Sequence, residues 1–139
     1  MSDAPDRRST PGGLGVLALI AGVAIGSGCS EPAACTLELR RAVQVEVRDA
    51  VSDDYIAGVV HGAVRDGSFE DSLRVVGWTG TDPGVTTTLG GADERPGTYA
   101  VHLEGAGYQA WDTARLQVSR DECHVQTVSF TARLTPTAP

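Results

Sequence analysis

Alternation of apolar and polar residues dominates the chain after residue 35. Residues 43–47 alternate valine with polar side chains, and residues 99–104 repeat this pattern with larger apolar members. A period of two residues is typical of a strand with one buried face. Similar but weaker patterns cover residues 56–65, 72–78, 109–118 and 124–134. No long stretch after Cys29 has a helical period, so we predict an all-β antiparallel β-sandwich with about seven strands.

The alternation also predicts which side chains face the core. Val101 is expected to point inward and His102 outward on one strand, and Ala114 is expected on the apolar face of the next. Gly58 and Gly62 interrupt the second strand pattern, which indicates a bulge or a close approach of another backbone.

A long connection is expected between residues 79 and 97. Gly, Thr, Asp and Pro dominate it, and only Val85 to Leu89 has the composition of a short strand. Connections of this length are usually functional or lack fixed structure. We therefore predict a surface connection, which is either a mobile loop without a function or a ligand-binding loop. It contains at most a weak edge strand that the fold does not need.

The N-terminal residues have the pattern of an export signal. Residues 14–25 are apolar and free of charge, and they are too few to make a good permanent membrane span. Small residues then precede Cys29, in a sequence that resembles a bacterial lipoprotein lipobox, although Gly26 stands where that motif usually has Leu. The resemblance implies that residues 1–28 are a signal peptide, that Cys29 receives the lipid, and that residues 29–35 form a tether. The alternatives are an uncleaved anchor or an ordinary secreted protein.

The cysteine count agrees with export. The chain has 3 cysteines, an odd number that would leave a reactive thiol outside the cell. If lipid consumes Cys29, then Cys35 and Cys123 remain to form a disulfide, which an oxidising compartment allows to persist. The alternative is two unpaired buried thiols.

Charge excludes one class of function. The chain has 11 Lys+Arg, all of them Arg, against 18 Asp+Glu, for a net charge of −7. A nucleic-acid-binding domain normally carries a basic patch, so we expect no nucleic-acid partner. A phosphate-binding loop that ends in Gly-Lys-Ser/Thr is excluded because the chain has no lysine.

The candidate catalytic and metal-binding residues are isolated in sequence. His61, His102 and His124 lack the tight spacing of a zinc site, and no serine lies in a Gly-x-Ser-x-Gly elbow. We interpret the histidines as surface residues and predict neither a metal, nor a cofactor, nor an enzymatic activity.

Two further groups have a functional and a structural interpretation. The carboxylates of Asp49, Asp53 and Asp54 offer oxygen ligands for calcium, but they lack the spacing of a dedicated loop and are expected to form a turn. The aromatic residues suit either a sugar-stacking platform or the core, and the core is favoured because they are few. Five of the seven are the candidates: Trp78, Tyr99, Tyr108, Trp111 and Phe130.

One family resemblance rests on short motifs in the second half of the chain. Residues 96–104, PGTYAVHLE, are followed by Gly107-Tyr108 and then by Leu116-Gln117-Val118. This series resembles the carboxypeptidase regulatory-like domain, which implies a transthyretin-like (prealbumin-like) β-sandwich over residues 36–134, followed by a tail at 135–139. The likeness is weakest between residues 66 and 93.

Two functions remain open at the level of sequence. The first is a non-catalytic lipoprotein of the bacterial cell envelope, exported and lipid-anchored to a membrane, whose sandwich is an interaction or structural module with a possible envelope protein partner. The second is an envelope lipoprotein that binds a carbohydrate or peptide at the loops of one end of the sandwich. Exposed aromatic side chains at such an end would favour the second.

Overall fold

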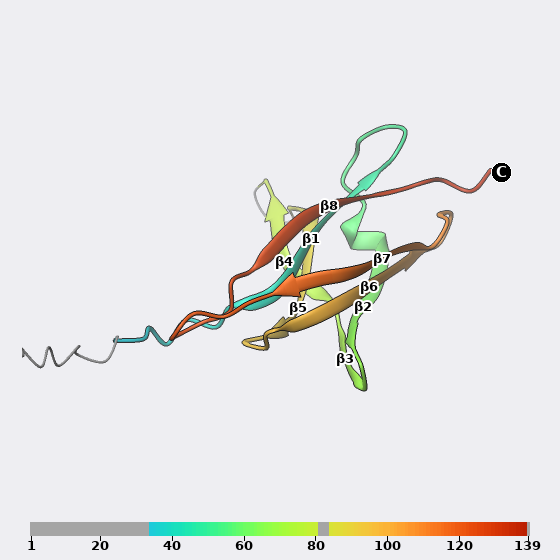
Figure 1. The fold of residues 1–139 in the computed structure, drawn as a ribbon. Coiled ribbons are helices and arrows are strands. Elements are labelled where there is room, and N and C mark those ends of the chain that lie inside the picture. Colours follow the sequence, from blue (N-terminus) through green and yellow to red (C-terminus); the bar gives the residue numbers. More distant parts are fainter. Residues whose placement is uncertain (1–33, 81–83, 139) are drawn as a thin grey trace, which may run out of the picture. The chain divides into compact units, whose positions relative to one another are not determined.

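The computed structural model describes residues 34–80 and 84–138, and this part of the chain is all-β (Figure 1). The one helical element in these ranges is a short 3-10 turn, η1 (Ala57–Val59). The strands are β1 (Arg41–Asp49), β2 (Val60–Asp66), β3 (Phe69–Ser72), β4 (Arg74–Thr79), β5 (Val85–Asp93), β6 (Gly97–Gly105), β7 (Trp111–Val118) and β8 (Val128–Leu134).

The strands form two sheets of four, in a sandwich-like arrangement. One sheet has the order β4-β5-β1-β8 and the other β3-β2-β6-β7. Neighbouring strands are antiparallel with one exception, because β1 and β8 run parallel from the pair Val43 and Val128 onward. The prediction of an antiparallel sandwich is therefore corrected at this pair. Parallel neighbours need a long crossover, and here the rest of the domain provides it.

The core lies between the sheets and follows the predicted alternation. The inward residues of β1 and β6 are buried, while His102 on β6 is half-exposed, as predicted. The largest fully buried side chains are Tyr99, Leu103, Leu134, Val43, Val45, Val47, Val64, Val101 and Val125. Burial of apolar area on this scale is the main term that stabilises the fold.

The eighth strand is β3, which precedes the strand predicted at residues 72–78 and shares only Ser72 with it. The chain leaves one sheet after β3 and enters the other at β4, and Leu73 between them is buried. The backbone N–H of Leu73 donates to the carbonyl of Gly62 at 2.8 Å, which fixes this crossing. The sequence FEDS of β3 does not alternate apolar and polar residues, so no local pattern predicted this strand.

The prediction of a long connection with at most a weak edge strand at residues 79–97 is wrong. β5 occupies nine of these residues and pairs with both β1 and β4, so it is an inner strand. Its glycines are packing residues, since a Cβ on Gly90 would lie 2.8 Å from Cδ of Arg41 and 3.1 Å from Cγ2 of Val76. Glycine was interpreted as a turn signal, whereas here it lets neighbouring side chains approach the backbone.

A bulge corrects the predicted facing of β7. Arg115 has φ 63°, and the register against β6 shifts between Tyr99 and Val101. The extra residue leaves Ala114 exposed instead of on the apolar face, while Leu116 and Val118 return to it. A bulge of this kind turns the side chains that precede it to the opposite face.

The glycine prediction for the second strand holds at Gly62. A Cβ there would collide with the carbonyl oxygen of His102 on β6 and lie 2.6 Å from Cδ2 of Leu103. The strand itself begins later than expected, because η1 occupies the residues before Val60.

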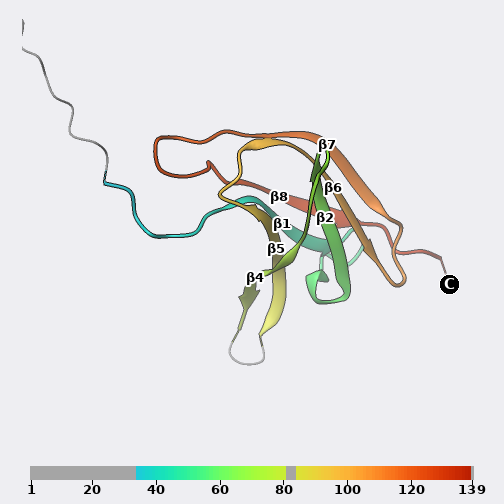
Figure 2. The same ribbon diagram turned by 90° about the horizontal axis from the view of Figure 1, so that it is seen from below.

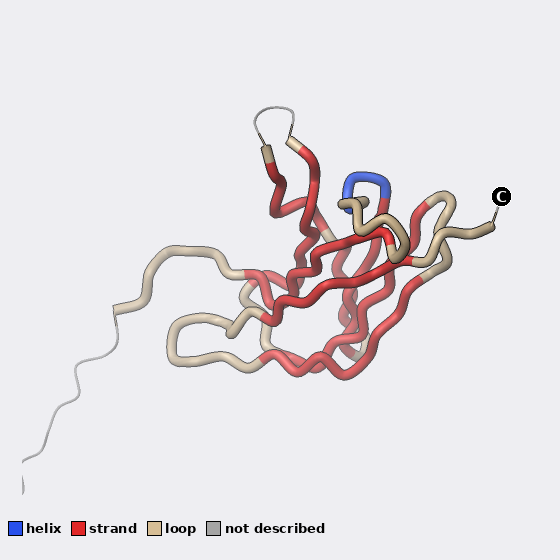
Figure 3. Tube along the Cα trace, turned by 90° about the horizontal axis from the view of Figure 1, so that it is seen from above, coloured by secondary structure: helices blue, strands red, loops and turns tan. Residues whose placement is uncertain are grey.

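Each end of the sandwich gathers a different set of segments. The entry segment (residues 34–40) and the β7–β8 connection (residues 119–127) lie at the same end (Figures 1 and 3). The β6–β7 turn and the C-terminal residues lie at the other, where the N–H of Thr137 donates to the carbonyl of Gly107 at 2.8 Å. Figure 2 shows the β4–β5 hairpin projecting from the side of the sandwich.

Candidate functional site at the disulfide-closed end

A disulfide joins the entry segment to the β7–β8 connection. Cys35 and Cys123 are 88 residues apart in sequence and their Cα atoms are 5.2 Å apart, within the normal range for a bridge. The predicted pairing required the beginnings of the first and last strands to be neighbours. The parallel pairing of β1 with β8 brings the beginnings of these two strands side by side.

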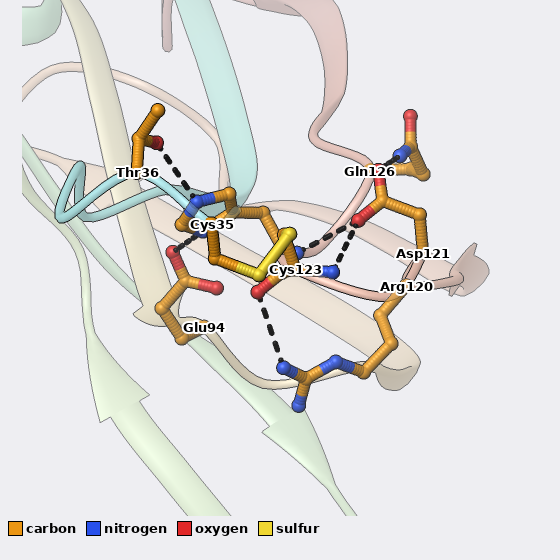
Figure 4. Close-up of a disulfide and its surroundings, with 8 residues drawn as sticks. Cys35, Thr36, Glu94, Arg120, Asp121, Cys123 and Gln126 are labelled. Atoms are coloured by element: carbon orange, nitrogen blue, oxygen red, sulfur yellow. Dashed lines mark hydrogen bonds and ion pairs between the residues drawn. A yellow bond between two sulfur atoms is a disulfide. The ribbon is translucent and has the colours of Figure 1, made fainter. Parts of the chain in front are cut away.

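The β7–β8 connection contains a tight turn organised by Asp121. Its Oδ1 accepts hydrogen bonds from the backbone N–H groups of Cys123 and His124, each at 2.8 Å (Figure 4). The amide of Gln126 donates to Oδ2. The His124 amide and then the Cys123 amide hold the pKa of Asp121 below its usual value, because both hydrogen bonds favour the ionised carboxylate. The last strand therefore starts at Val128 rather than at His124 as predicted.

His124 is buried, which corrects its interpretation as a surface residue. Its Nδ1 lies 2.8 Å from Oε1 of Glu94, and its Nε2 lies 3.1 Å from the hydroxyl oxygen of Thr36. A carboxylate only accepts, so Nδ1 carries the proton, and in the neutral ring Nε2 accepts from the threonine. Figure 4 labels Thr36 and Glu94 beside the disulfide, each with a dashed line to its partner.

Glu94 also binds the backbone just before β1. Its Oε1 accepts from the N–H of Arg40 at 2.7 Å, and its own N–H donates to the Arg40 carbonyl at 2.8 Å. The Arg40 amide, ahead of His124, keeps the pKa of Glu94 below its usual value. The turn after β5 thus holds one end of the entry segment while the disulfide holds the other.

Hydroxyl, imidazole and carboxylate stand here in the order that many hydrolases use to activate a nucleophile. In this site the three groups come from three separate segments, and Oε1 of Glu94 is shared with a backbone amide. The arrangement crosslinks those segments and thereby holds the entry segment. We call Cys35, Thr36, Glu94, Cys123 and His124 together the entry clamp.

The three aspartates considered for calcium lie at the opposite end, where Asp49 ends β1 and the other two follow it. Asp49 accepts from the N–H groups of Val51 and Ser52 at 2.7 and 3.0 Å, which organises the turn. Asp53 pairs with the guanidinium groups of Arg48 and Arg133. Across residues 34–80 and 84–138, no three His, Cys, Asp or Glu side chains are placed to hold a metal ion.

The remaining histidines lie on the outer face of the second sheet. His61 is 3.4 Å from the carboxylate of Glu104, and Nδ1 of His102 is 2.7 Å from that of Asp112. Both are on strands, as the alternation predicted, and neither approaches the entry clamp.

The aromatic residues divide between core and surface. Tyr99 is fully buried, and its hydroxyl donates to the Arg95 carbonyl at 2.8 Å. Trp111 stacks on Phe130 with ring centroids 5.8 Å apart, and Tyr108 packs against the core with them. Trp78 is the exception, because it is 64% exposed on β4. The five residues therefore do not form one exposed platform.

Sequence reasoning missed two members of the entry clamp, Thr36 and Glu94, and also the turn residue Asp121 beside it. Glu94 lies 30 residues from His124, and Thr36 lies 88 residues from it, so no local pattern connects them. Asp121 carried a usable signal, since an aspartate two residues before a cysteine often accepts a hydrogen bond from the backbone in a turn. Cys29 lies outside the described residues.

No family model matches the chain, and no curated protein matches it. The resemblance to the carboxypeptidase regulatory-like domain therefore rests on the short motifs quoted above. Within the part of the chain that the structure describes, no helix is long and apolar enough to cross a membrane.

Proposed function

We propose that the protein is a non-catalytic lipoprotein of the bacterial cell envelope. Residues 1–28 direct export, Cys29 carries the lipid, and the β-sandwich acts as an interaction or structural module. The observation that carries the proposal is the pairing of Cys35 with Cys123. It accounts for two of the 3 cysteines, suits an oxidising compartment, and leaves Cys29 for the lipid.

The entry clamp supports an anchored role. It closes the sandwich at the residues where the chain arrives from the tether, and it binds that segment through a covalent bond and through Glu94. In a lipid-anchored protein, the clamp would join the tether firmly to the sandwich.

The same proposal includes membership of the transthyretin-like class. Two four-stranded sheets support it, and so does the placement of the PGTY motif at the start of β6 with Tyr99 buried. The Gly107-Tyr108 pair lies in the turn between β6 and β7, where the resemblance expects it.

The alternative is an envelope lipoprotein that binds a carbohydrate or peptide. One observation favours it: the exposed ring of Trp78 lies at the tip of the β4–β5 hairpin, where a Cβ on Gly84 would be 3.0 Å from its Cδ1. Exposed aromatic rings stack on sugars and peptides. Loss of glycan or peptide retention in Trp78→Ala, with unchanged stability, would support this function.

Mass spectrometry of the protein extracted from membranes tests the main proposal. We expect residues 1–28 to be absent and acyl mass to be present on Cys29. The matched control is Cys29→Ser, which should keep the Cys35–Cys123 bridge and lose the acyl mass. An intact Met1 in the membrane-extracted protein would refute lipidation. Crosslinking in intact membranes, followed by pull-down, would then identify the envelope partner.

A further inference from the structure

The entry segment exposes two leucines. Leu37 is 104% exposed and Leu39 is 56% exposed. Glu38 lies between them and forms an ion pair with Arg40 at 3.5 Å, so the two charges of this segment compensate each other. The result is a short apolar surface without net charge, on a chain whose overall charge is −7.

The entry clamp fixes both ends of this surface. Cys35 and Thr36 are held on one side by the disulfide and by His124, and Arg40 is held on the other by Glu94. Leu37 and Leu39 lie between these points. Their exposure is therefore imposed by the clamp and does not result from a loose chain end.

We propose that Leu37 and Leu39 contact the membrane that holds the lipid of Cys29. This inference rests on the lipidation proposed above. Five residues, 30–34, lie between Cys29 and Cys35, so a fully extended chain places the Cα atoms of the two cysteines at most about 22 Å apart. The leucines follow immediately, so the anchor keeps them within reach of the lipid surface, where apolar side chains bind at the boundary between headgroups and acyl chains.

A fluorescence experiment on the full lipidated chain tests the contact. Leu37→Trp is compared with Val51→Trp after reconstitution into phosphatidylcholine vesicles with and without brominated acyl chains. Val51 is the matched control, because it is an apolar residue, 82% exposed, at the other end of β1. The parent chain gives the background of Trp78 and Trp111. Urea unfolding of both variants checks that the fold is kept.

The expected result is a blue shift and a bromine-dependent loss of emission for Trp at position 37, with neither at position 51. Emission unaffected by bromine, in protein that floats with the vesicles, would overturn the contact while leaving the anchor intact. A blue shift without bromine quenching would place the segment against protein, such as a second copy of the chain, and would also overturn it. Failure to float would refute the lipid anchor itself.

Discussion

Tyr108 donates its hydroxyl proton to Oδ2 of Asp49 across 2.9 Å and thereby joins the β6–β7 turn to the turn after β1. The backbone N–H groups of Ser52 and Val51 are the main reasons that the pKa of Asp49 lies below its usual value, and the Tyr108 hydroxyl adds to them. The same bond raises the pKa of Tyr108, because ionising the phenol would place two negative charges together. One carboxylate thus organises the end of the sandwich opposite the entry clamp.

Acid should weaken this end of the domain. Because the folded pKa of Asp49 is depressed, its contribution to stability is complete above the unfolded value of about 3.9 and is lost as pH falls through the folded pKa. Urea unfolding at a series of pH values should show Asp49→Asn less stable than the parent at pH 6, with the difference shrinking below about pH 4. Glu122→Gln, a charge removal at an exposed site, controls for net charge. A difference that stays constant down to acid pH would contradict this role of Asp49.

The facing of β6 makes a second prediction. Val101 is buried between the sheets, so Val101→Asp should prevent folding, since an unpaired charge in the core costs several kcal/mol against a total of about 5–15 kcal/mol. His102→Ala, one residue away on the outer face, should change the free energy of unfolding by less than about 0.5 kcal/mol. Circular dichroism and urea unfolding distinguish the two. Equal damage from both would show that the strand register is wrong.

Removal of β5 should be fatal to the fold. Replacing residues 80–94 with a Gly/Ser linker deletes an inner strand, exposes the edges of β1 and β4, and takes away Glu94 of the entry clamp. We expect an unfolded or aggregated product. A matched change that replaces only residues 81–83 should leave the free energy of unfolding nearly unchanged. A folded protein without β5 would contradict the topology.

The disulfide should be a large contributor to stability. It closes a loop of 88 residues, for which chain entropy sets an upper value of about 4–5 kcal/mol. Urea unfolding with and without reductant should show this loss for the parent, and the Cys35→Ser/Cys123→Ser double variant should match the reduced parent. Cys29→Ser should retain the effect of reductant. Insensitivity of the parent to reductant would indicate unpaired thiols.

Local patterns predicted the parts of the fold whose cause is local. The alternation in β1 and β6 identified the buried valines and Tyr99 because burial of one face imposes a period of two. The bulge at Arg115 and the crossing at Leu73 were missed, because each depends on the strand alongside. Gly90 was interpreted as part of a connection for the same reason, because the small size of glycine there allows the side chains of Arg41 and Val76 on neighbouring strands to approach the backbone.

The candidate site also has one part that the sequence predicted and one part that depends on the folded topology. Cysteine parity identified the bridge between Cys35 and Cys123, because parity and compartment restrict the possible pairs. The bonds from His124 to Glu94 and Thr36 join residues that are distant in sequence, and only the folded topology brings them together.

The disulfide also determines how the domain responds to mechanical tension. A force applied to the chain ahead of Cys35 divides at that residue between the backbone that leads to β1 and the covalent bridge to the β7–β8 connection. The bridge therefore carries part of the load that would otherwise fall on the first hydrogen bonds that pair β1 with β5 and β8. Under load from its N-terminus, the sandwich is held both at β1 and at the connection that precedes β8.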